Sequence, residues 1–398
     1  MPSPLLLLSD THLSKSYGHA TGEAMATLID RHPNAEIIFV GDILDLSLEP
    51  AATQTGEAVR AALSPHKSLR ASLRQHLRAG GRLTWIPGNH DAGLACEDAQ
   101  EVLRQELSAP AQDSVNVEQW FSRRGELHLE HGHLFDRDCR TPHPLAEFDP
   151  RTEGLGTALM RRFVAPNDAL VFAHAHTTTP TSGLWTAFAR WGLRAPVIIY
   201  NYFHTAFLLL NEARQNPKRF EEIRRQMDSS LKEHAQNTGV PEELLSTLVQ
   251  RAPSPTHQNF SSLFFRLYFD RIFSGLAVAA GIGVLISKGI LHSTEDQTTF
   301  VSHLSNAALL AAGVGGAYLT QSLLREPARY GQGPADALET SAGLVQNHTQ
   351  AGQIIFGHSH VECQTPHYLN LGSFGYGATR PYALVDASGR ATPFHFNA

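Results

Sequence analysis

Leu5-Leu6-Leu7-Leu8-Ser9-Asp10-Thr11-His12, near the start of the chain, is a short apolar run that ends in polar residues. A run of this kind is typical of a buried parallel strand. It is too short for the core of a signal peptide, and no basic residue precedes it. We therefore expect a strand at Leu5–Leu8, with Asp10 and His12 just beyond its carboxyl end.

The same pattern recurs downstream, where strands alternate with helices. Further strands are predicted at residues 36–40, 82–86 and 126–130. Helices are predicted at residues 23–31, 57–79 and 96–107, where apolar residues recur at helical spacing. This alternation indicates an α/β fold, and such sheets bind their ligands at the carboxyl ends of the strands.

The character of the sequence changes in the middle of the chain. We expect residues 1–140 to form the first part of a catalytic core and residues 141–345 a mostly helical insertion. The insertion includes a charged, helical segment over residues 212–232 and a proline-containing linker at residues 252–256. Strand-like patterns resume after Gly352, so residues 346–398 are predicted to supply the closing strands of the core.

Composition narrows the class of protein. Hydrophobic residues make up 42% of 398 residues, which is enough for a substantial core. The net charge is −6 and no long basic run occurs, which argues against a nucleic-acid-binding surface. The three cysteines, Cys96, Cys139 and Cys363, are far apart, which argues against a disulfide framework and for a reducing compartment.

Five polar clusters stand at the ends of predicted strands. They are Asp10-Thr11-His12, Gly41-Asp42-Ile43-Leu44-Asp45, Gly88-Asn89-His90-Asp91, His131-Gly132-His133 and Gly357-His358-Ser359-His360. Their oxygen and imidazole donors suit Mn, Fe, Zn or Ni. A pair of divalent ions roughly 3.5–4 Å apart can clamp a phosphate and activate water, and it needs one carboxylate that bridges both ions. The glycines allow tight turns and close backbone approach.

Each cluster alone has a structural explanation, such as a surface histidine or a helix-capping aspartate. All five in order are much harder to explain in that way. Together they resemble the motifs of the calcineurin-like metallophosphoesterase superfamily: D-x-H, G-D-x-x-D, G-N-H-D, a His-Gly dipeptide and G-H-x-H. The resemblance covers roughly residues 1–137 and 350–398. It implies a β-sandwich flanked by helices and hydrolysis of a phosphoester or phosphoanhydride bond by a metal-bridging hydroxide.

The resemblance also implies a role for each matching residue. Asp42 would bridge two divalent ions, for which Mn is the leading candidate. The first ion would be held by Asp10, His12, Asp42 and His360. The second would be held by Asp42, Asn89, His131 and His358. His90 would be the general acid for the leaving oxygen, oriented by Asp45, for which the structural alternative is a loop cap. His133 would support the site without holding a metal.

A second histidine pair competes for the last motif. Val171-Phe172-Ala173-His174-Ala175-His176 echoes Ile355-Phe356-Gly357-His358-Ser359-His360. We favour the later copy, because it has the turn glycine and is followed by strand-like segments. His174 and His176 would then line the rim of the pocket or be structural.

Two apolar stretches in the insertion approach the length of membrane-spanning helices. Residues 272–291 contain one charged residue, Lys288, and residues 304–324 contain none. The connection between them holds Glu295 and Asp296, whereas the outer flanks are basic, so the positive-inside rule puts both flanks in the cytoplasm. The alternative is a buried hairpin in a soluble cap. Small residues at four-residue intervals, Gly275/Ala279/Gly283 and Ala308/Ala312/Gly316, would let the helices approach closely.

The leading hypothesis is thus a hydrolase on the cytoplasmic side of a membrane, the inner membrane if bacterial. Its substrate would be an amphiphilic or lipid-linked phosphate or pyrophosphate, or a phosphorylated small molecule. The chain partly resembles the UDP-2,3-diacylglucosamine diphosphatase branch at residues 131–135, but has His90 where that branch has arginine. The alternatives are a soluble cytoplasmic phosphodiesterase or protein phosphatase with a helical cap, and an inactive metal-binding scaffold.

Overall fold

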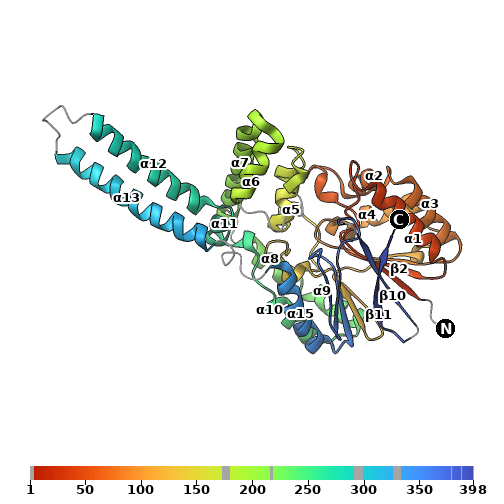
Figure 1. Ribbon diagram of the computed structural model, residues 1–398. Helices are drawn as coiled ribbons and strands as arrows, with labels where there is room; N and C mark the ends of the chain where they lie inside the picture. Colours follow the sequence, from red (N-terminus) through yellow and green to blue (C-terminus); the bar gives the residue numbers. More distant parts are fainter. Residues whose placement is uncertain are drawn as a thin grey trace.

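The computed structural model describes residues 4–172, 180–215, 218–290, 299–325, 333–377, 379–386 and 388–397 (Figure 1). Two β-sheets are flanked by helices, and a long helical hairpin extends from one end of the molecule. The predicted fold, a β-sandwich flanked by helices with a large helical insertion, is confirmed.

The first sheet is built mainly from the N-terminal part of the chain. Its strands are β1 (Leu5–Leu8), β2 (Glu36–Val40), β3 (Leu83–Ile86), β4 (Val115–Val117), β10 (Arg380–Val385) and β11 (Ala391–Phe396). Their order is β11-β10-β1-β2-β3-β4; β1 to β4 are parallel, and β10 is antiparallel to β1. Strand β4 was not predicted, because three residues are too few to show a periodic pattern.

The second sheet joins segments that are far apart in the sequence. Its strands are β5 (Phe121–Arg124), β6 (Leu127–Glu130), β7 (Gln353–Phe356), β8 (Glu362–Gln364) and β9 (Tyr368–Leu371), in the order β5-β6-β7-β9-β8. Strand β6 pairs in parallel with β7, with Leu127 opposite Gln353. The insertion therefore begins and ends within one sheet, and its described residues add no strand.

Apolar side chains between the two sheets form the central core. Leu7, Ile38 and Ile86 from the first sheet lie in one buried cluster with Leu129 and Ile355 from the second. Strands that face a core on both sides read as nearly continuous apolar runs. That explains why residues 5–8 and 36–40 could be recognised as strands from the sequence.

Four helices cover the outer face of the first sheet. They are α1 (His19–Arg31), α2 (Thr55–Leu63), α3 (Lys67–Arg78) and α4 (Glu97–Leu107). The prediction of one helix over residues 57–79 was wrong, since α2 and α3 are separate. Pro65 lies between them, and a proline inside a helix removes a hydrogen bond and clashes with the preceding turn.

The insertion is almost entirely helical. Its helices are α5 (Leu155–Leu159), α6 (Pro180–Trp191), α7 (Ala195–Gln215), α8 (Arg219–Gln226), α9 (Asp228–Thr238), α10 (Glu242–Arg251), α11 (Phe260–Arg266), α12 (Phe269–Ile290), α13 (Thr299–Leu324) and α15 (Pro334–Thr349). Helices α9, α10 and α15 cover the outer face of the second sheet. The charged segment over residues 212–232 is helical as predicted in its described part, which comprises the end of α7, all of α8 and the start of α9.

Helices α12 and α13 form the hairpin that extends from the molecule (Figure 1). Their contact runs through small residues, and a Cβ atom at Gly281 would collide with Ala312. Ala308 and Ala312 lie at this contact as predicted, but the prediction for Gly275 and Gly283 was wrong, since a Cβ atom at either would meet nothing within 4 Å. Helix α12 is rotated so that the face bearing Gly281, not the face bearing Gly275 and Gly283, meets α13.

Candidate metal centre

The loops that follow five strands meet at one end of the sandwich. Asp10 follows β1, Asp42 follows β2, Asn89 follows β3, His131 follows β6 and His358 follows β7. The sandwich brings together candidate ligands that are far apart in the chain, such as His12 and His360, which are separated by 348 residues. All of these side chains are buried or nearly so.

The backbone of this region is held in an uncommon conformation. Five candidate ligands have positive φ: Asp10 (53°), His12 (49°), Asp42 (54°), His358 (65°) and His360 (58°). For residues other than glycine this costs roughly 1–3 kcal/mol each and persists only where the surroundings enforce it. Backbone hydrogen bonds do so here, since the N–H of Asp10 bonds Gly41 O at 3.1 Å and that of His12 bonds Asp42 O at 3.0 Å.

One group of donors lies around the Asp10 carboxylate. His360 Nε2 is 3.2 Å from Asp10 Oδ1, and the Nε2 atoms of His12 and His360 are 3.1 Å apart. One carboxylate oxygen and two imidazole nitrogens all lie within 4.8 Å of one another. That spacing and donor chemistry suit a first-row divalent ion.

A second group lies on the other side of Asp42. His131 Nε2 is 3.1 Å from Asp42 Oδ2, and His358 Nδ1 is 3.3 Å from His131 Nε2. Donor atoms of these three residues also lie within 4.8 Å of one another. Asp42 forms a further group of this kind with His12 and His90. Its carboxylate therefore lies between the two sets of histidines.

Asn89 provides a test of whether a metal fits the second group. Its Nδ2 donates to Thr157 Oγ1 of helix α5 at 3.2 Å, which turns Oδ1 the other way. Oδ1 is buried and accepts no hydrogen bond from the described residues. An orphaned buried acceptor is costly, and a cation would satisfy it. We conclude that the donor set fits a metal ion.

Glycine is required where these loops approach the ligands. A Cβ atom at Gly88 would collide with the Asp42 carboxylate, and one at Gly357 would collide with Ser9 and Asp10. Gly41 combines a φ of 82° with close contact to the His131 ring. These glycines lie in three of the five motifs, as the sequence predicted.

His90 lies beside the candidate ligands with its ring held by two partners. Its Nδ1 is 3.0 Å from Asp45 Oδ1 and 3.0 Å from Ser47 Oγ, and Asp45 also accepts from the Ser47 hydroxyl at 2.5 Å. The His90 backbone N–H donates to Asp42 Oδ1 at 2.8 Å. Asp45 also accepts from the Ser47 N–H at the start of a short 3₁₀ turn, so it both orients His90 and caps a loop.

The ionisation of Asp42, His131 and His90 depends on the charges that these side chains place on one another. Burial opposes ionisation of Asp42, but His131 and His90 outweigh it and hold the pKa of its carboxyl well below the usual range. Burial likewise opposes protonation of His131, and the Asp42 and Asp10 carboxylates outweigh it and raise its pKa to about 10. For His90, Asp45 and Asp42 outweigh burial and raise the pKa to about 9. Cationic partners thus stabilise the ionised Asp42 in this pocket.

Asp91, in the G-N-H-D motif, has a role that the sequence did not reveal. Its carboxylate accepts backbone N–H groups from Asp42, Ile43, Leu44 and Gly88 at 2.6–3.3 Å. Burial, followed by the charge on Asp42, raises its pKa to about 7. Asp91 therefore ties the Asp42 loop to the Gly88 loop and sets the position of the central carboxylate.

Asp136 is a second residue that sequence reasoning missed. Its Oδ2 lies 3.0 Å from His358 Nε2, while the Nδ1 of that ring faces His131. A partner on the far nitrogen is how proteins orient a metal-binding histidine. Cys139 lies in the same group, and burial raises the pKa of its thiol. The only sequence signal for Asp136 was its place shortly after the His131 motif.

His133 lies apart from the candidate ligand groups. The ring centroid of His133 is 5.5 Å from that of His131, and burial followed by repulsion from His131 lowers its pKa to about 3. His133 belongs to none of the four groups found among the described residues. His174 and His176 lie outside the described residues.

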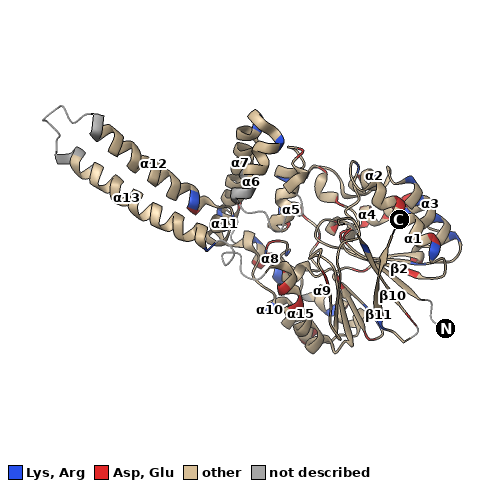
Figure 2. Cartoon of the chain, viewed as in Figure 1, with Lys and Arg blue, Asp and Glu red and all other residues tan. Residues whose placement is uncertain are grey.

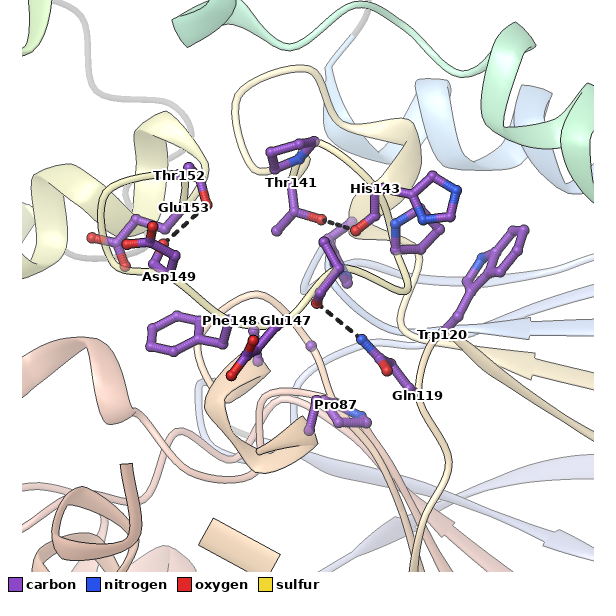
Figure 3. Close-up of a pocket in the computed structure, with 17 residues that line it drawn as sticks. Pro87, Gln119, Trp120, Thr141, His143, Glu147, Phe148, Asp149, Thr152 and Glu153 are labelled. Atoms are coloured by element: carbon purple, nitrogen blue, oxygen red, sulfur yellow. Dashed lines mark hydrogen bonds between the residues drawn. The ribbon is translucent and has the colours of Figure 1, made fainter. Parts of the chain in front are cut away.

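A small cleft of about 40 Å³, partly open to solvent, adjoins the centre (Figure 3). Gly88 and His133, which line the cleft, belong to the loops that carry the candidate metal ligands. Its walls combine rings with polar groups, including Trp120, Phe148 and Thr141 (Figure 3). The segment over residues 141–153 supplies much of the lining and is held by hydrogen bonds such as Gln119 Nε2 to Ala146 O at 3.1 Å.

We expect the double variant His358→Ala/His360→Ala to lose metal and activity, whereas His174→Ala/His176→Ala does not. The later pair supplies a donor to each group around Asp42 and Asp10. Removing a residue that only supports a metal ligand typically lowers metal affinity or activity by about 10–100-fold. Removing two ligands should therefore lower metal affinity and activity by at least about that factor. Metal content and hydrolysis of an aryl phosphodiester would be measured on both variants. If the earlier pair is essential and the later is not, our assignment of the last motif is wrong.

Comparison with known proteins adds one match. Residues 3–192 match the family described as calcineurin-like phosphoesterase. No curated protein matches the chain. The matched range contains four of the five motifs and ends before His358 and His360, which the structure brings into the centre.

Proposed function

Because this chain carries a calcineurin-like phosphoesterase domain, and with it metal-dependent phosphoester hydrolysis, we propose that two divalent ions act at this centre with Asp42 between them. Asp10, His12, Asp42 and His360 would hold the first ion. Asp42, Asn89, His131 and His358 would hold the second. The observation that carries the proposal is that Asp42 belongs to two donor groups, one with His131 and His358 and the other with His12 and His90.

The donor set also bears on the chemistry. When bound, a pair of such ions lowers the pKa of water toward neutrality and neutralises charge on a phosphate. Carboxylate and imidazole donors favour Mn here, and Fe, Zn or Ni would also fit. The cleft beside Gly88 and His133 adjoins the place where the phosphate would lie.

His90 is suited to donate a proton to the leaving oxygen. Asp45 and Ser47 hold Nδ1, so the donated proton would be the one on Nε2. Asp45 thereby orients the ring and favours its protonated form. A general acid requires this combination of fixed geometry and an available proton.

A metal-loading and hydrolysis experiment tests the proposal. We expect purified protein to bind two Mn²⁺ per chain and to hydrolyse an aryl phosphodiester only when loaded. A panel that adds a lipid pyrophosphate and a phosphorylated peptide would rank the substrate classes. Two bound ions with no hydrolysis of any of these would indicate an inactive scaffold. A single bound ion would contradict the bridging role of Asp42.

The exposed apolar surface of the hairpin supports the proposal that the enzyme acts at a membrane. Residues Phe269–Ser287 and Ser305–Leu324 have mean hydropathies of 1.7 and 1.4, and only 17% and 6% of these residues are buried in the molecule. A core helix of a soluble protein would be mostly buried, so this exposure favours a membrane-spanning hairpin. Charged residues gather at its base, where Arg271 bonds Ser322 and Asp270 accepts from Tyr318 (Figure 2).

The charges that flank the hairpin favour one orientation. Arg266 and Arg325 lie at its base, beside the catalytic domain, whereas Glu295 and Asp296 of the connection lie outside the described residues. Basic flanks remain in the cytoplasm, so the metal centre would face the cytoplasm. An enzyme held there would reach amphiphilic phosphates or pyrophosphates in the bilayer, which is the substrate class we propose.

We expect the full chain to remain in membranes through washes with high salt and with carbonate. A variant lacking residues 272–324 should be released and should still hydrolyse a soluble aryl phosphodiester. The reason is that an exposed apolar hairpin is stable only in lipid. Fractionation followed by blotting and an activity assay would measure both outcomes. Full-length protein that is soluble without detergent would replace the membrane hypothesis with a soluble enzyme that carries a helical cap.

A further inference from the structure

Exposed apolar side chains are confined almost entirely to the insertion. Among the described residues, Val361 and Phe394 are the only large hydrophobic residues of the two-sheet domain that are exposed. The others lie between Val171 and Leu324. They are Val171 itself, Phe260 and Phe265 of α11, and residues of the hairpin and of a second region formed by α6, α7 and the turn between them. Contiguous exposed apolar surface marks a binding surface, and the second region is not part of the hairpin.

We call this second region the α6–α7 surface and define it by six exposed residues. They are Trp185, Phe188, Leu193, Val197, Tyr200 and Phe207. Leu193, in the turn, is 99% exposed, and Trp185 is 79% exposed. The opposite face of α7 is already covered, because Ala206 and Leu209 pack with Leu155 of α5 and Leu263 of α11. The surface therefore has no covering element within the described chain.

The charge of this region indicates which kind of partner would cover the α6–α7 surface. Between residues 180 and 211 the sequence has two charged residues, Arg190 and Arg194, and no acidic residue. Both arginines are exposed and lie beside the turn. Aromatic and aliphatic side chains next to basic residues characterise helices that lie in the surface of an anionic bilayer. A soluble acidic protein would match the arginines but not the exposed Trp185 and Leu193.

The position of the surface fits the same partner. Helix α7 packs on α11, and Phe203 of α7 lies 6.5 Å, centroid to centroid, from Phe269 at the start of α12. Figure 1 shows α6 and α7 at a wide angle to α12 and α13. A hairpin that crosses a bilayer would thus leave α6 and α7 running along the bilayer surface, at the level where the hairpin enters.

Helix α5 connects this surface to the metal centre. Leu155 and Ala158 on one face of α5 pack against Ala206 of α7. Thr157, on another face, accepts a hydrogen bond from Asn89 at 3.2 Å. A lipid contact at α6 and α7 would therefore lie one helix away from a proposed metal ligand.

We propose that the α6–α7 surface lies in the head-group layer of an anionic lipid bilayer and holds the metal centre next to a phosphate borne by lipid. This inference rests on the proposed membrane location and not on the proposed chemistry. The contact would restrict the tilt of the catalytic domain, which the hairpin alone would leave free to pivot.

Tryptophan fluorescence can test the contact, because α12 and α13 contain no tryptophan. The four tryptophans are Trp85 and Trp120, which are buried, Trp191, which is partly buried, and the exposed Trp185. Full-length protein would be reconstituted in phosphatidylglycerol vesicles with brominated acyl chains, which quench tryptophan on contact. We expect quenching of the wild type, loss of most of it in Trp185→Phe, and little loss in the matched control Trp191→Phe.

A charge-reversal variant tests the role of the arginines. Arg190→Glu/Arg194→Glu should reduce quenching, and should leave hydrolysis of a soluble aryl phosphodiester unchanged. Wild-type protein that resists carbonate extraction but shows no quenching would overturn the inference and leave the hairpin in place. A dimer in detergent that shields Trp185 from iodide would overturn it in favour of a second copy. If the metal-loaded wild type hydrolysed no phosphoester, the proposed function would be contradicted. The quenching experiment would still test the lipid contact, because it does not depend on hydrolysis.

Discussion

Replacing Asp42 with alanine is expected to abolish hydrolysis and to release both metal ions. Asp42 is the proposed ligand common to both ions, and its side chain is almost completely buried between His131 and His12. Without metal, the pKa of a water nucleophile rises from about 7 to its much higher value in bulk water, which removes the nucleophile at neutral pH. Metal content by mass spectrometry and turnover of an aryl phosphodiester would measure the two effects.

Two further variants separate the loss of metal from misfolding. In the wild type, Asp42 Oδ1 accepts a hydrogen bond from the His90 backbone N–H at 2.8 Å. Asp42→Asn keeps an oxygen that can accept this hydrogen bond but removes the negative charge. It should fold and still lose metal and activity. Asp386→Ala, in an exposed turn of the same domain, should leave both unchanged. Two ions bound to either Asp42 variant at wild-type affinity would disprove the bridging assignment.

His90→Ala is expected to retain its metals and to lose about 10²–10⁴-fold in kcat, the usual contribution of general acid catalysis. The loss should be greatest for an alkyl phosphodiester, because its leaving oxygen needs a proton. A nitrophenyl ester should lose much less, because its leaving group departs as an anion. The ratio of the two losses is the measurement that identifies an acid.

Asp45→Asn and His395→Ala complete this test. Asp45 Oδ1 lies 3.0 Å from His90 Nδ1, so the asparagine variant should show a smaller loss with the same dependence on leaving group. His395 lies on β11, where it pairs with Glu362 at 2.7 Å, and its alanine variant should behave as wild type. Equal losses with both esters in His90→Ala would argue for a positioning role instead.

The strands and the candidate ligands could be recognised from the sequence for a physical reason. Residues 5–8 and 36–40 are buried on both faces, so they are continuously apolar, and polar residues that follow such runs lie at the carboxyl ends of strands. The order of the five motifs then identified the fold through its resemblance to a known superfamily. Pro65, which separates α2 from α3, was also present in the sequence, but regular apolar spacing obscured it.

Other features depend on contacts between distant segments, which no local pattern encodes. One of the two partners of β6 is β7, on the far side of the insertion, and that pairing brings His358 to His131. Asp136 and Thr157 gain their roles only because folding places them against His358 and Asn89. Likewise, apolar periodicity predicts a helix but not which face is covered. Only the packing of α7 on α5 and α11 shows that Trp185 and Leu193 remain exposed, and only the rotation of α12 brings Gly281 to α13.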